Sequence, residues 1–370
     1  MMPLPSEVSL PSEAIPTDTV VLRPPRPGDT DDLLAAANDA LVSRYVTALP
    51  APFTSEDAQR WVTAGARSVI ADPHTDRLLG AAGLHPVSEA DGAARIGCWV
   101  APWGRGQGVG AAALGALTGW ANTHGFDRVE LLTEPGNATG QRMAVRAGLT
   151  YEGVRRGAGR GRNGKRHDLV AWARLAGDPP GPSPRRLPDL PGGELTDGVV
   201  LIRPLVAGDT GDMFALMSLP ESVRTTVPPV VPDPVGVRRR CEQSQGEWIA
   251  GERARMTIRD AATGTFAGNI GLHWTGPGMD ELLVGYALAR PYRGRGYATR
   301  ATKLVARWAL TEVGAPRLLS GTAPENVASQ RVLERAGFQR EGYERSRLPG
   351  ADGGRIDNVS FGLLPRDLLD

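Results

Sequence analysis

Two short glycine-rich loops are the parts of this sequence best suited to chemistry. They read Arg105-Gly-Gln-Gly-Val-Gly110 and Arg293-Gly-Arg-Gly-Tyr-Ala298, and each lies between a predicted strand and a predicted helix. Glycines let successive backbone N–H groups converge on one point, and the helix adds its unsatisfied N–H groups and positive dipole end. The arginine adds a permanently charged, forked donor. The pattern predicts a pyrophosphate site, with a plain glycine-rich turn as the structural alternative.

A dinucleotide site is a weaker interpretation of the first loop. Gly106 to Ala111 fits a relaxed Gly-x-Gly-x-x-Ala fingerprint. That fingerprint should open a βαβ unit and precede an acidic residue by about 20 positions. Here each loop falls late in its half of the chain, and the second copy, from Gly294 to Thr299, departs from the pattern. The chain also lacks the Gly-Lys-Ser/Thr triplet of a nucleoside triphosphate loop.

The two halves of the chain repeat each other. Residues of the same type recur in the same order, first 180, then 188 and finally 189 positions apart. Conserved order over so long a stretch indicates a duplicated domain. The matched pairs are Arg23 and Arg203, Asp29 and Asp209, Gly97 and Gly285, Trp120 and Trp308, Asn137 and Asn326, Gly148 and Gly337, Glu152 and Glu341, and Asp168 and Asp357.

The predicted elements are those of an α/β fold. Apolar residues at Ala301, Leu304, Val305, Trp308 and Ala309 have the i, i+3, i+4, i+7, i+8 spacing of an amphipathic helix after the second loop. Strands are predicted before and after each loop, which gives mixed strands and helices in both halves. We expect a flexible tail at 1–18, domains at 19–175 and 198–370, and a Pro/Gly-rich linker at 176–197.

The composition is that of an ordinary globular protein. The 370 residues are 41% hydrophobic and carry a net charge of +1, so no bulk field recruits nucleic acid or acidic membranes. Two cysteines and five scattered histidines give no disulfide framework and no metal spacing. With no signal-like N-terminus and no run of about 20 apolar residues, the sequence predicts a cytoplasmic protein without a metal or a membrane anchor.

Further motifs accompany the loops. They are Leu22-Arg23-Pro24 with Ile202-Arg203-Pro204, the stretch Gly285-Tyr-Ala-Leu288, Asn326-x-x-Ser329, Val332 to Phe338, and Glu341-Gly342. Together with the Arg-x-x-Gly-x-Gly/Ala loops, they resemble the GNAT superfamily, most closely its RimJ/RimL-type branch of ribosomal-protein N-terminal acetyltransferases. The resemblance implies two tandem GNAT domains, each a mixed, splayed sheet flanked by helices. It also implies transfer of an acetyl group from acetyl-CoA to a primary amine, expected to be the α-amino group of a protein or peptide.

The resemblance places coenzyme A along both loops. The strand before each loop would separate from its neighbour, and its N–H groups would polarise the thioester carbonyl. We place those groups at Leu288–Ala289 and Val100–Ala101. The implied coenzyme A contacts are Leu288, Ala289, Arg293, Gly294, Arg295, Gly296, Tyr297, Ala298 and Asn326 in the second half, and Val100, Ala101, Arg105, Gly106, Gln107, Gly108, Val109, Gly110 and Asn137 in the first.

The halves differ at the position of the acid. The resemblance implies that Ser329 protonates the departing thiolate, whereas the first half has Gly140 there. Asn326 and Ser329 also have a structural interpretation, because asparagine is a strong helix N-cap and a serine three residues later can support it. The two roles are compatible.

The general base is less clear from the resemblance. A RimL-like glutamate would fall nineteen residues after the serine, but that position is Leu348 in the second half and Gly159 in the first. Glu281, on the strand leading into the second loop, is the expected substitute, and its first-half counterpart is Ala93. A solvated surface role is the alternative for Glu281. We therefore expect the second domain to be the catalytic one.

Alternatives remain open at this point. The chain could acetylate a small-molecule amine, such as an antibiotic or a metabolite, or it could bind acyl-CoA without turnover. The Gly/Arg-rich stretch from Arg155 to Arg166 is expected to be a solvated hairpin, with a grip on acidic peptide or RNA as the alternative. The sequence leaves the oligomeric state open, including a homodimer.

Overall fold

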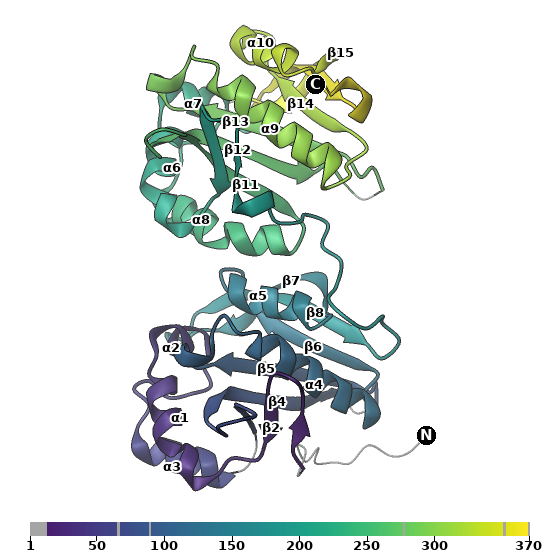
Figure 1. Cartoon of the computed structure of the whole chain (residues 1–370). Helices are drawn as coiled ribbons and strands as arrows, with labels where there is room; N and C mark the ends of the chain where they lie inside the picture. The colour runs from purple at the N-terminus through teal and green to yellow at the C-terminus, as the bar shows by residue number, and fades with distance from the viewer. Residues whose placement is uncertain (1–12, 65–66, 89, 277, 351–352, 369–370) are drawn as a thin grey trace. The chain divides into compact units, whose positions relative to one another are not determined.

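The computed structural model describes residues 13–64, 67–88, 90–276, 278–350 and 353–368. The chain divides into two compact units, Met1–Pro184 and Arg185–Asp370. Both units are mixtures of strands and helices (Figure 1), as the sequence predicts.

The first unit is an α/β domain. Its strands are β1 (Ile15–Pro16), β2 (Val21–Arg23), β3 (Ser68–Ala71), β4 (Leu78–Ser88), β5 (Ala93–Val100), β6 (Arg128–Thr133), β7 (Thr150–Arg160) and β8 (Arg166–Leu175). Its helices are α1 (Thr30–Ala37), α2 (Ala40–Tyr45), α3 (Ser55–Ala64), α4 (Val109–Thr123) and α5 (Ala138–Arg146).

The second unit repeats this order. Its strands are β9 (Leu195–Thr196), β10 (Val200–Pro204), β11 (Arg253–Asp260), β12 (Phe266–Trp274), β13 (Leu282–Leu288), β14 (Leu318–Thr322), β15 (Gln339–Pro349) and β16 (Arg355–Leu363). Its helices are α6 (Thr210–Met217), α7 (Pro220–Thr225), α8 (Pro234–Ile249), α9 (Tyr297–Thr311) and α10 (Val327–Arg335).

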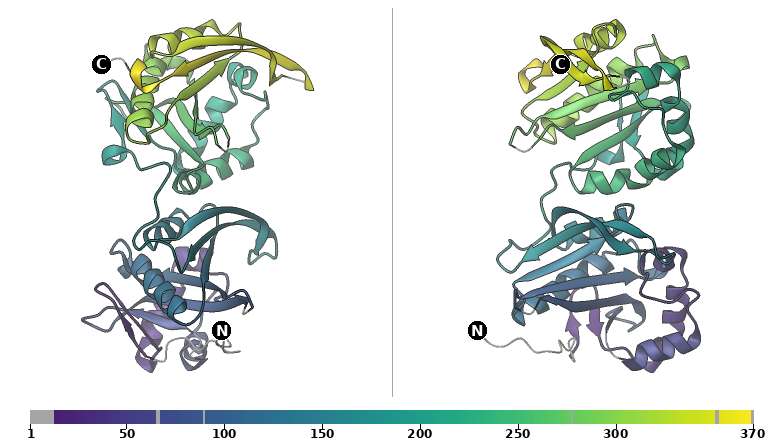
Figure 2. Two further views of the ribbon diagram at one scale, coloured as in Figure 1. Left: turned by 90° about the vertical axis from the view of Figure 1, so that its right-hand side faces the viewer. Right: turned by 180° about the vertical axis from the view of Figure 1, so that it is seen from behind.

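The two sheets have the same topology. Among the described strands, the order is β1-β2-β3-β4-β5-β6-β8-β7 in one unit and β9-β10-β11-β12-β13-β14-β16-β15 in the other. The pairs β5/β6 and β13/β14 are parallel, and the remaining neighbours run antiparallel. Both sheets are strongly twisted (Figure 2), and the last two strands of each form a long curved ribbon. The shared topology agrees with a duplicated domain.

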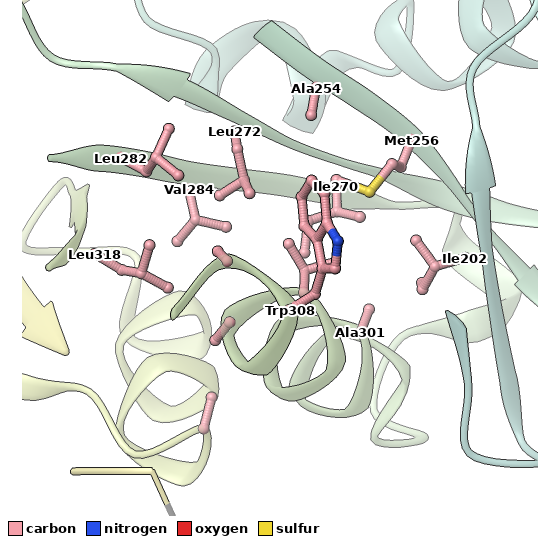
Figure 3. Packing of buried hydrophobic residues seen from close by; sticks show 14 of the residues in the cluster. Ile202, Ala254, Met256, Ile270, Leu272, Leu282, Val284, Ala301, Trp308 and Leu318 are labelled. Carbon is pink, nitrogen blue, oxygen red and sulfur yellow. The ribbon is translucent and has the colours of Figure 1, made fainter. Parts of the chain in front are cut away.

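Helix α9 packs its apolar stripe on the second sheet. Trp308 and Ala301 face Ile270, Met256 and the strands around them (Figure 3). The predicted stripe is confirmed, because Ala301, Val305, Trp308 and Ala309 are buried and Leu304 is partly buried against the same core. A fully buried tryptophan contributes several kcal/mol, on the order of 3–5 by the cost of truncating it. This packing fixes the start of α9, and with it the loop before the helix.

Parts of the expected tail and linker make contacts with the two units. The tail of 1–18 is described only from residue 13, and within it Ile15–Pro16 form β1, which pairs with β2. The expected linker of 176–197 divides between the units. Ser183 donates to the Leu149 carbonyl at 2.6 Å, whereas Leu187 and Leu190 are buried in the second core. Sequence reasoning missed these two buried leucines because they stand among prolines and glycines.

The described helices include none with the length and apolarity to cross a membrane. Within the same residues, no three His, Cys, Asp or Glu side chains gather in a way that could hold a metal ion.

Candidate active site

Each central parallel strand pair separates after a short contact. β13 and β14 pair at Leu282–Leu318 and Leu283–Leu319, whereas β12 stays paired with β13 up to Leu288. Beyond the contact, Ser320 Oγ donates to the Val284 carbonyl at 3.1 Å. The remainder of β13 therefore turns one backbone edge toward an opening between the two strands.

The direction of the backbone groups decides which amides enter this opening. The Leu282 N–H donates across to the Arg317 carbonyl at 3.2 Å, so it points toward β14. Backbone groups alternate direction along a strand, which also points the N–H groups of Tyr286 and Leu288 toward the opening. The Ala289 N–H instead donates to the Ala267 carbonyl at 2.8 Å. Of the two expected donors, only Leu288 is directed into the opening; Ala289 is held by the sheet.

The first domain repeats this arrangement. β5 pairs with β6 only from Ala93 to Arg95, and Ala101 donates its N–H to the Leu79 carbonyl at 2.8 Å. The Val100 N–H is directed into the opening by the same alternation. Val100 therefore corresponds to Leu288, and Ala101 is held by the sheet.

The glycine-rich loops form cradles for an anion. Gly294 and Gly296 have φ of 70° and 81°, and Gly106 and Gly108 have φ of 78° and 79°, all left-handed values that favour glycine. No atom lies within 4 Å of a Cβ built on any of the four, so the space above each glycine is open. Helices α9 and α4, each of 15 residues, begin directly behind. Converging N–H groups, open space and a helix N-terminus fit a pyrophosphate.

The loop arginines have structural partners. Arg293 donates from Nε to the Leu288 carbonyl at 2.9 Å and from Nη1 to Glu221 at 2.8 Å. Arg290 also binds Glu221, and these guanidinium groups, Arg290 foremost, hold the pKa of Glu221 below its usual range. Arg105 pairs with Asp39, which lowers the pKa of that carboxyl. Each arginine, expected as a forked phosphate donor, thus anchors its loop, Arg293 to α7 and Arg105 to the start of α2. The backbone N–H groups of the loops remain to bind an anion.

Ser329 and Asn326 begin α10 at the edge of the second opening. The Asn326 side chain accepts the Ser329 N–H at 3.2 Å, which is the N-cap geometry. The Ser329 hydroxyl lies 3.0 Å from the hydroxyl of Tyr286. Burial raises the pKa of Tyr286 to about 12, so this phenol keeps its proton at neutral pH. Sequence reasoning missed Tyr286, although its position in the strand before the loop was a signal.

The first domain lacks both hydroxyls. The residues equivalent to Tyr286 and Ser329 are Cys98 and Gly140. Asn137 still caps its helix by accepting the Gly140 N–H at 2.9 Å. Burial raises the pKa of Cys98 to about 12, so its thiol stays protonated at neutral pH.

Glu281 is not brought to the other site residues. It lies just before β13, with Arg317 Nε 3.6 Å from its carboxylate. Seven residues of extended chain separate it from Leu288, a distance of about 24 Å at 3.4 Å per residue. Glu281 thus lies at the end of β13 that is paired with β14, and its expected role as the general base stays a prediction.

The first domain contains a cavity of about 510 Å³, here called the first-domain cavity. Its lining comes from β4, β5, β6, α5, the β7/β8 ribbon and the segment 45–49. Two of its lining residues form a pair: His167 Nε2 lies 3.5 Å from Glu134 Oε1. Sequence reasoning judged the histidines scattered and missed this pair, because Glu134 follows β6 and His167 lies on β8, 33 positions later.

Cationic side chains also line the first-domain cavity. Arg67, Arg95 and Arg160 are among its lining residues. Burial, together with Arg67 and Arg95, lowers the pKa of His85 on the same wall. The wall therefore carries more positive than negative charge.

The Gly/Arg-rich hairpin is tied to the domain and is not simply solvated. Arg162 donates to the carbonyls of Ser43, Val46 and Leu49 at distances of 2.7 to 3.2 Å. These carbonyls lie at and after the end of α2, where a cation is favourable. Arg162 thus fixes the segment 45–49, one wall of the first-domain cavity.

Comparison with known proteins gives several relatives. "Probable N-acetyltransferase YjcK" of Bacillus subtilis (strain 168) is 32% identical over 30% of this chain and 63% of its own length. "Putative ribosomal N-acetyltransferase YdaF" of the same organism is 32% identical over 28% of this chain and 56% of its own length. The chain thus spans less than two thirds of either protein. Among solved structures, Mycobacterium smegmatis RimJ in complex with CoA-disulfide matches with 22% identity and a TM-score of 0.43, covering 47% of this chain and 85% of that one.

A family model decides the classification. The model of the acetyltransferase (GNAT) domain matches residues 19–150 and again 200–339, which together exceed half of the chain. Both matches contain a splayed strand pair followed by a glycine-rich loop and a helix. Proteins with this fold use acetyl-CoA as the acetyl donor. The chain belongs to the GNAT acetyltransferase family and contains the GNAT domain twice.

Proposed function

We propose that the chain is an acetyl-CoA-dependent N-acetyltransferase whose C-terminal domain acetylates the α-amino group of a protein or peptide. The observation that carries the proposal is the Tyr286–Ser329 hydroxyl pair at 3.0 Å, on the two elements that border the β13/β14 opening. The equivalent residues of the first domain, Cys98 and Gly140, offer no such pair.

The chain would hold acetyl-CoA, which supplies the activated acetyl group, through backbone donors. The amides of 294–298 bind the pyrophosphate in the same manner in which the 106–110 amides would bind it in the first domain. The N–H groups of Leu288 and Tyr286 point into the opening and polarise the carbonyl there. The hydroxyl of Tyr297 donates to Asp260, and this contact holds the end of the loop in place.

Ser329 supplies the proton to the departing sulfur. Its hydroxyl lies within hydrogen-bonding distance of Tyr286, whose phenol remains protonated at neutral pH. Tyr286 can therefore return a proton to Ser329 through that contact, and solvent water then restores the proton on Tyr286. The pair acts as a short proton relay at the edge of the opening.

The acceptor must be neutral to attack. An α-amino group has an ordinary pKa near 8 and a lysine side chain near 10.4, so the α-amino group needs far less help at neutral pH. Glu281 lies about 24 Å along the strand from Leu288. Such an acceptor suits this site, because water can take its proton. The relative YdaF is named a putative ribosomal N-acetyltransferase, which also supports a protein acceptor.

The test is acetyl-CoA turnover by the full chain against peptide N-termini and small amines. Ser329→Ala should lower kcat about 100-fold with little change in the KM for acetyl-CoA, in the range of general acid catalysis. Ser218→Ala, at an exposed serine after α6, is the matched control. Gly296→Val should abolish peptide turnover, and Gly108→Val should leave it intact.

Two results would sink the assignment. Loss of peptide turnover in Gly108→Val with normal turnover in Gly296→Val would move that activity to the first domain. Binding of acetyl-CoA without turnover of any amine would instead support a non-catalytic acyl-CoA-binding module.

A further inference from the structure

The first-domain cavity lies where the parallel strands β5 and β6 end. Residues 95–99 of β5 and 131–134 at the end of β6 line it, together with Asn137 and Gly140 of the following turn and helix. Ligands of α/β sheets bind outside the carboxyl ends of parallel strands. Val100, which follows the lining residue Trp99, directs its amide toward the β5/β6 opening by strand alternation. A group held there would meet the side chains of the cavity wall.

Glu134 and His167 form a pair on this wall that a solvent-borne acceptor can reach. Their facing atoms are 3.5 Å apart, and the two side chains are 29% and 31% exposed. The backbone is shaped for the imidazole: Gly159 pairs with His167 across β7 and β8, and a Cβ on Gly159 would lie 2.3 Å from His167 Nε2. The ring thus occupies the space that any side chain at position 159 would fill.

The charges on the wall select the acceptor. Arg67, Arg95 and Arg160 line the cavity, whereas Glu134 is the one carboxylate among its described lining residues. The charge of Arg95 is neutralised by its ion pair with Glu130, a carboxylate that also binds Arg155. Arg67 has no ion pair within the part of the chain that the structure describes. The cavity is therefore matched to an anionic group.

We infer that the N-terminal domain is a second active site, in which His167 accepts the proton of a small amine that also carries a carboxylate. This inference rests on the proposed binding of acetyl-CoA, here at the 105–110 loop. His167 would be the catalytic base. Glu134 is a positioning residue that orients the imidazole through the 3.5 Å contact. The carboxylate of the acceptor would lie against Arg67 and Arg160.

The reaction balances without another reactant. The neutral amine nitrogen forms a bond to the acetyl carbonyl carbon, and the carbon–sulfur bond breaks with its electron pair passing to sulfur. His167 takes one proton from the nitrogen. The same number of protons returns to the thiolate from the imidazolium or from water, leaving an N-acetylated amine and free coenzyme A. This chemistry needs no hydroxyl at Gly140.

The experiment uses the full chain carrying Gly296→Val, so that turnover reports on the first domain. α-Amino acids are compared with their carboxamides as acceptors, and release of coenzyme A thiol is measured. We expect the amino acids to be acetylated with a kcat/KM at least about tenfold above that of the carboxamides. Arg67→Gln should remove most of that difference.

His167→Gln should lower kcat about 100-fold, the lower end of the range for acid–base catalysis, with an unchanged KM for acetyl-CoA. Glu134→Gln should lower kcat about tenfold. Added imidazole should partly restore His167→Ala, which a merely structural role would not allow. His124→Gln, at the end of α4 where the ring stacks on Trp120, is the matched control. Thermal unfolding of each variant shows whether the fold is retained.

Full turnover in a folded His167→Gln variant would overturn the inference. So would the absence of turnover of every amine in Gly296→Val when that variant still binds one acetyl-CoA. The failure of the C-terminal proposal is seen separately, since it concerns peptide turnover in Gly108→Val.

Discussion

Replacing Gly159 by alanine should disable the first domain by moving one imidazole ring. The added Cβ would lie 2.3 Å from His167 Nε2 and 2.7 Å from Cδ2 and Cε1. Ordinary contact begins near 3.4 Å, so the ring must move by about 1.1 Å. His167 is 31% exposed, which gives the ring room to move outward, away from Gly159. The contact with Glu134, already 3.5 Å long, would then be lost.

The size of the effect follows from this displacement. A misplacement of about 1 Å in a catalytic group can cost on the order of 100-fold in rate, so kcat for amine acetylation in the Gly296→Val background should fall about 100-fold. The free energy of unfolding should change by less than about 1 kcal/mol, because alanine restricts the unfolded chain while the ring moves into solvent.

Steady-state kinetics and thermal unfolding of the same preparation separate the two quantities. Gly177→Ala is the control, since nothing lies within 4 Å of its added Cβ. Wild-type turnover in Gly159→Ala would refute the reasoning, because His167 would then be dispensable. A large loss of stability would also refute it, because the ring would then be fixed by packing.

Three further predictions concern proton transfer and stability. Tyr286→Phe should lower kcat for peptide acetylation about tenfold with KM unchanged, less than the roughly 100-fold of a direct acid–base group because Tyr286 acts through Ser329, while Tyr343→Phe, whose hydroxyl binds Asp357, should not lower it. Trp308→Ala should destabilise the second unit by about 3–5 kcal/mol, and calorimetry should show its transition moving while that of the first unit stays in place. The pKa of Glu221 is lowered by Arg290 and Arg293, so its ion pairs stabilise the fold above the ordinary glutamate pKa. This stabilisation is lost as the pH falls below about 4.5. Glu221→Gln should therefore flatten the decline in melting temperature of the second unit between pH 5 and 3, and an unchanged slope would contradict this.

The parts of the site that depend on local sequence could be predicted. The glycine-rich loops, the helices behind them and the caps at Asn137 and Asn326 are all set by neighbouring residues. Glycine at a left-handed φ and asparagine before a helix have strong local preferences. Duplication made these signals visible twice.

The parts that depend on sheet pairing could not be predicted. Tyr286 meets Ser329 across 43 positions, and Glu134 meets His167 only because β6 and β8 are neighbours in the sheet. For Glu281 the strand alternation indicates a face of the sheet, but its distance from the opening depends on how far β13 and β14 stay paired. The division of the expected linker also depended on burial of Leu187 and Leu190 in a core that the local sequence does not reveal.

The contacts of Arg162 have a consequence for the energetics of acceptor binding. One side chain on the hairpin fixes the segment 45–49, so the wall of the first-domain cavity and the hairpin must exist in their native form together. If the cavity binds the acceptor only when both segments are in this native form, the apparent Kd equals the intrinsic Kd divided by the population of that form. A substitution of this exposed arginine is therefore expected to change the affinity for the acceptor without changing any reacting group.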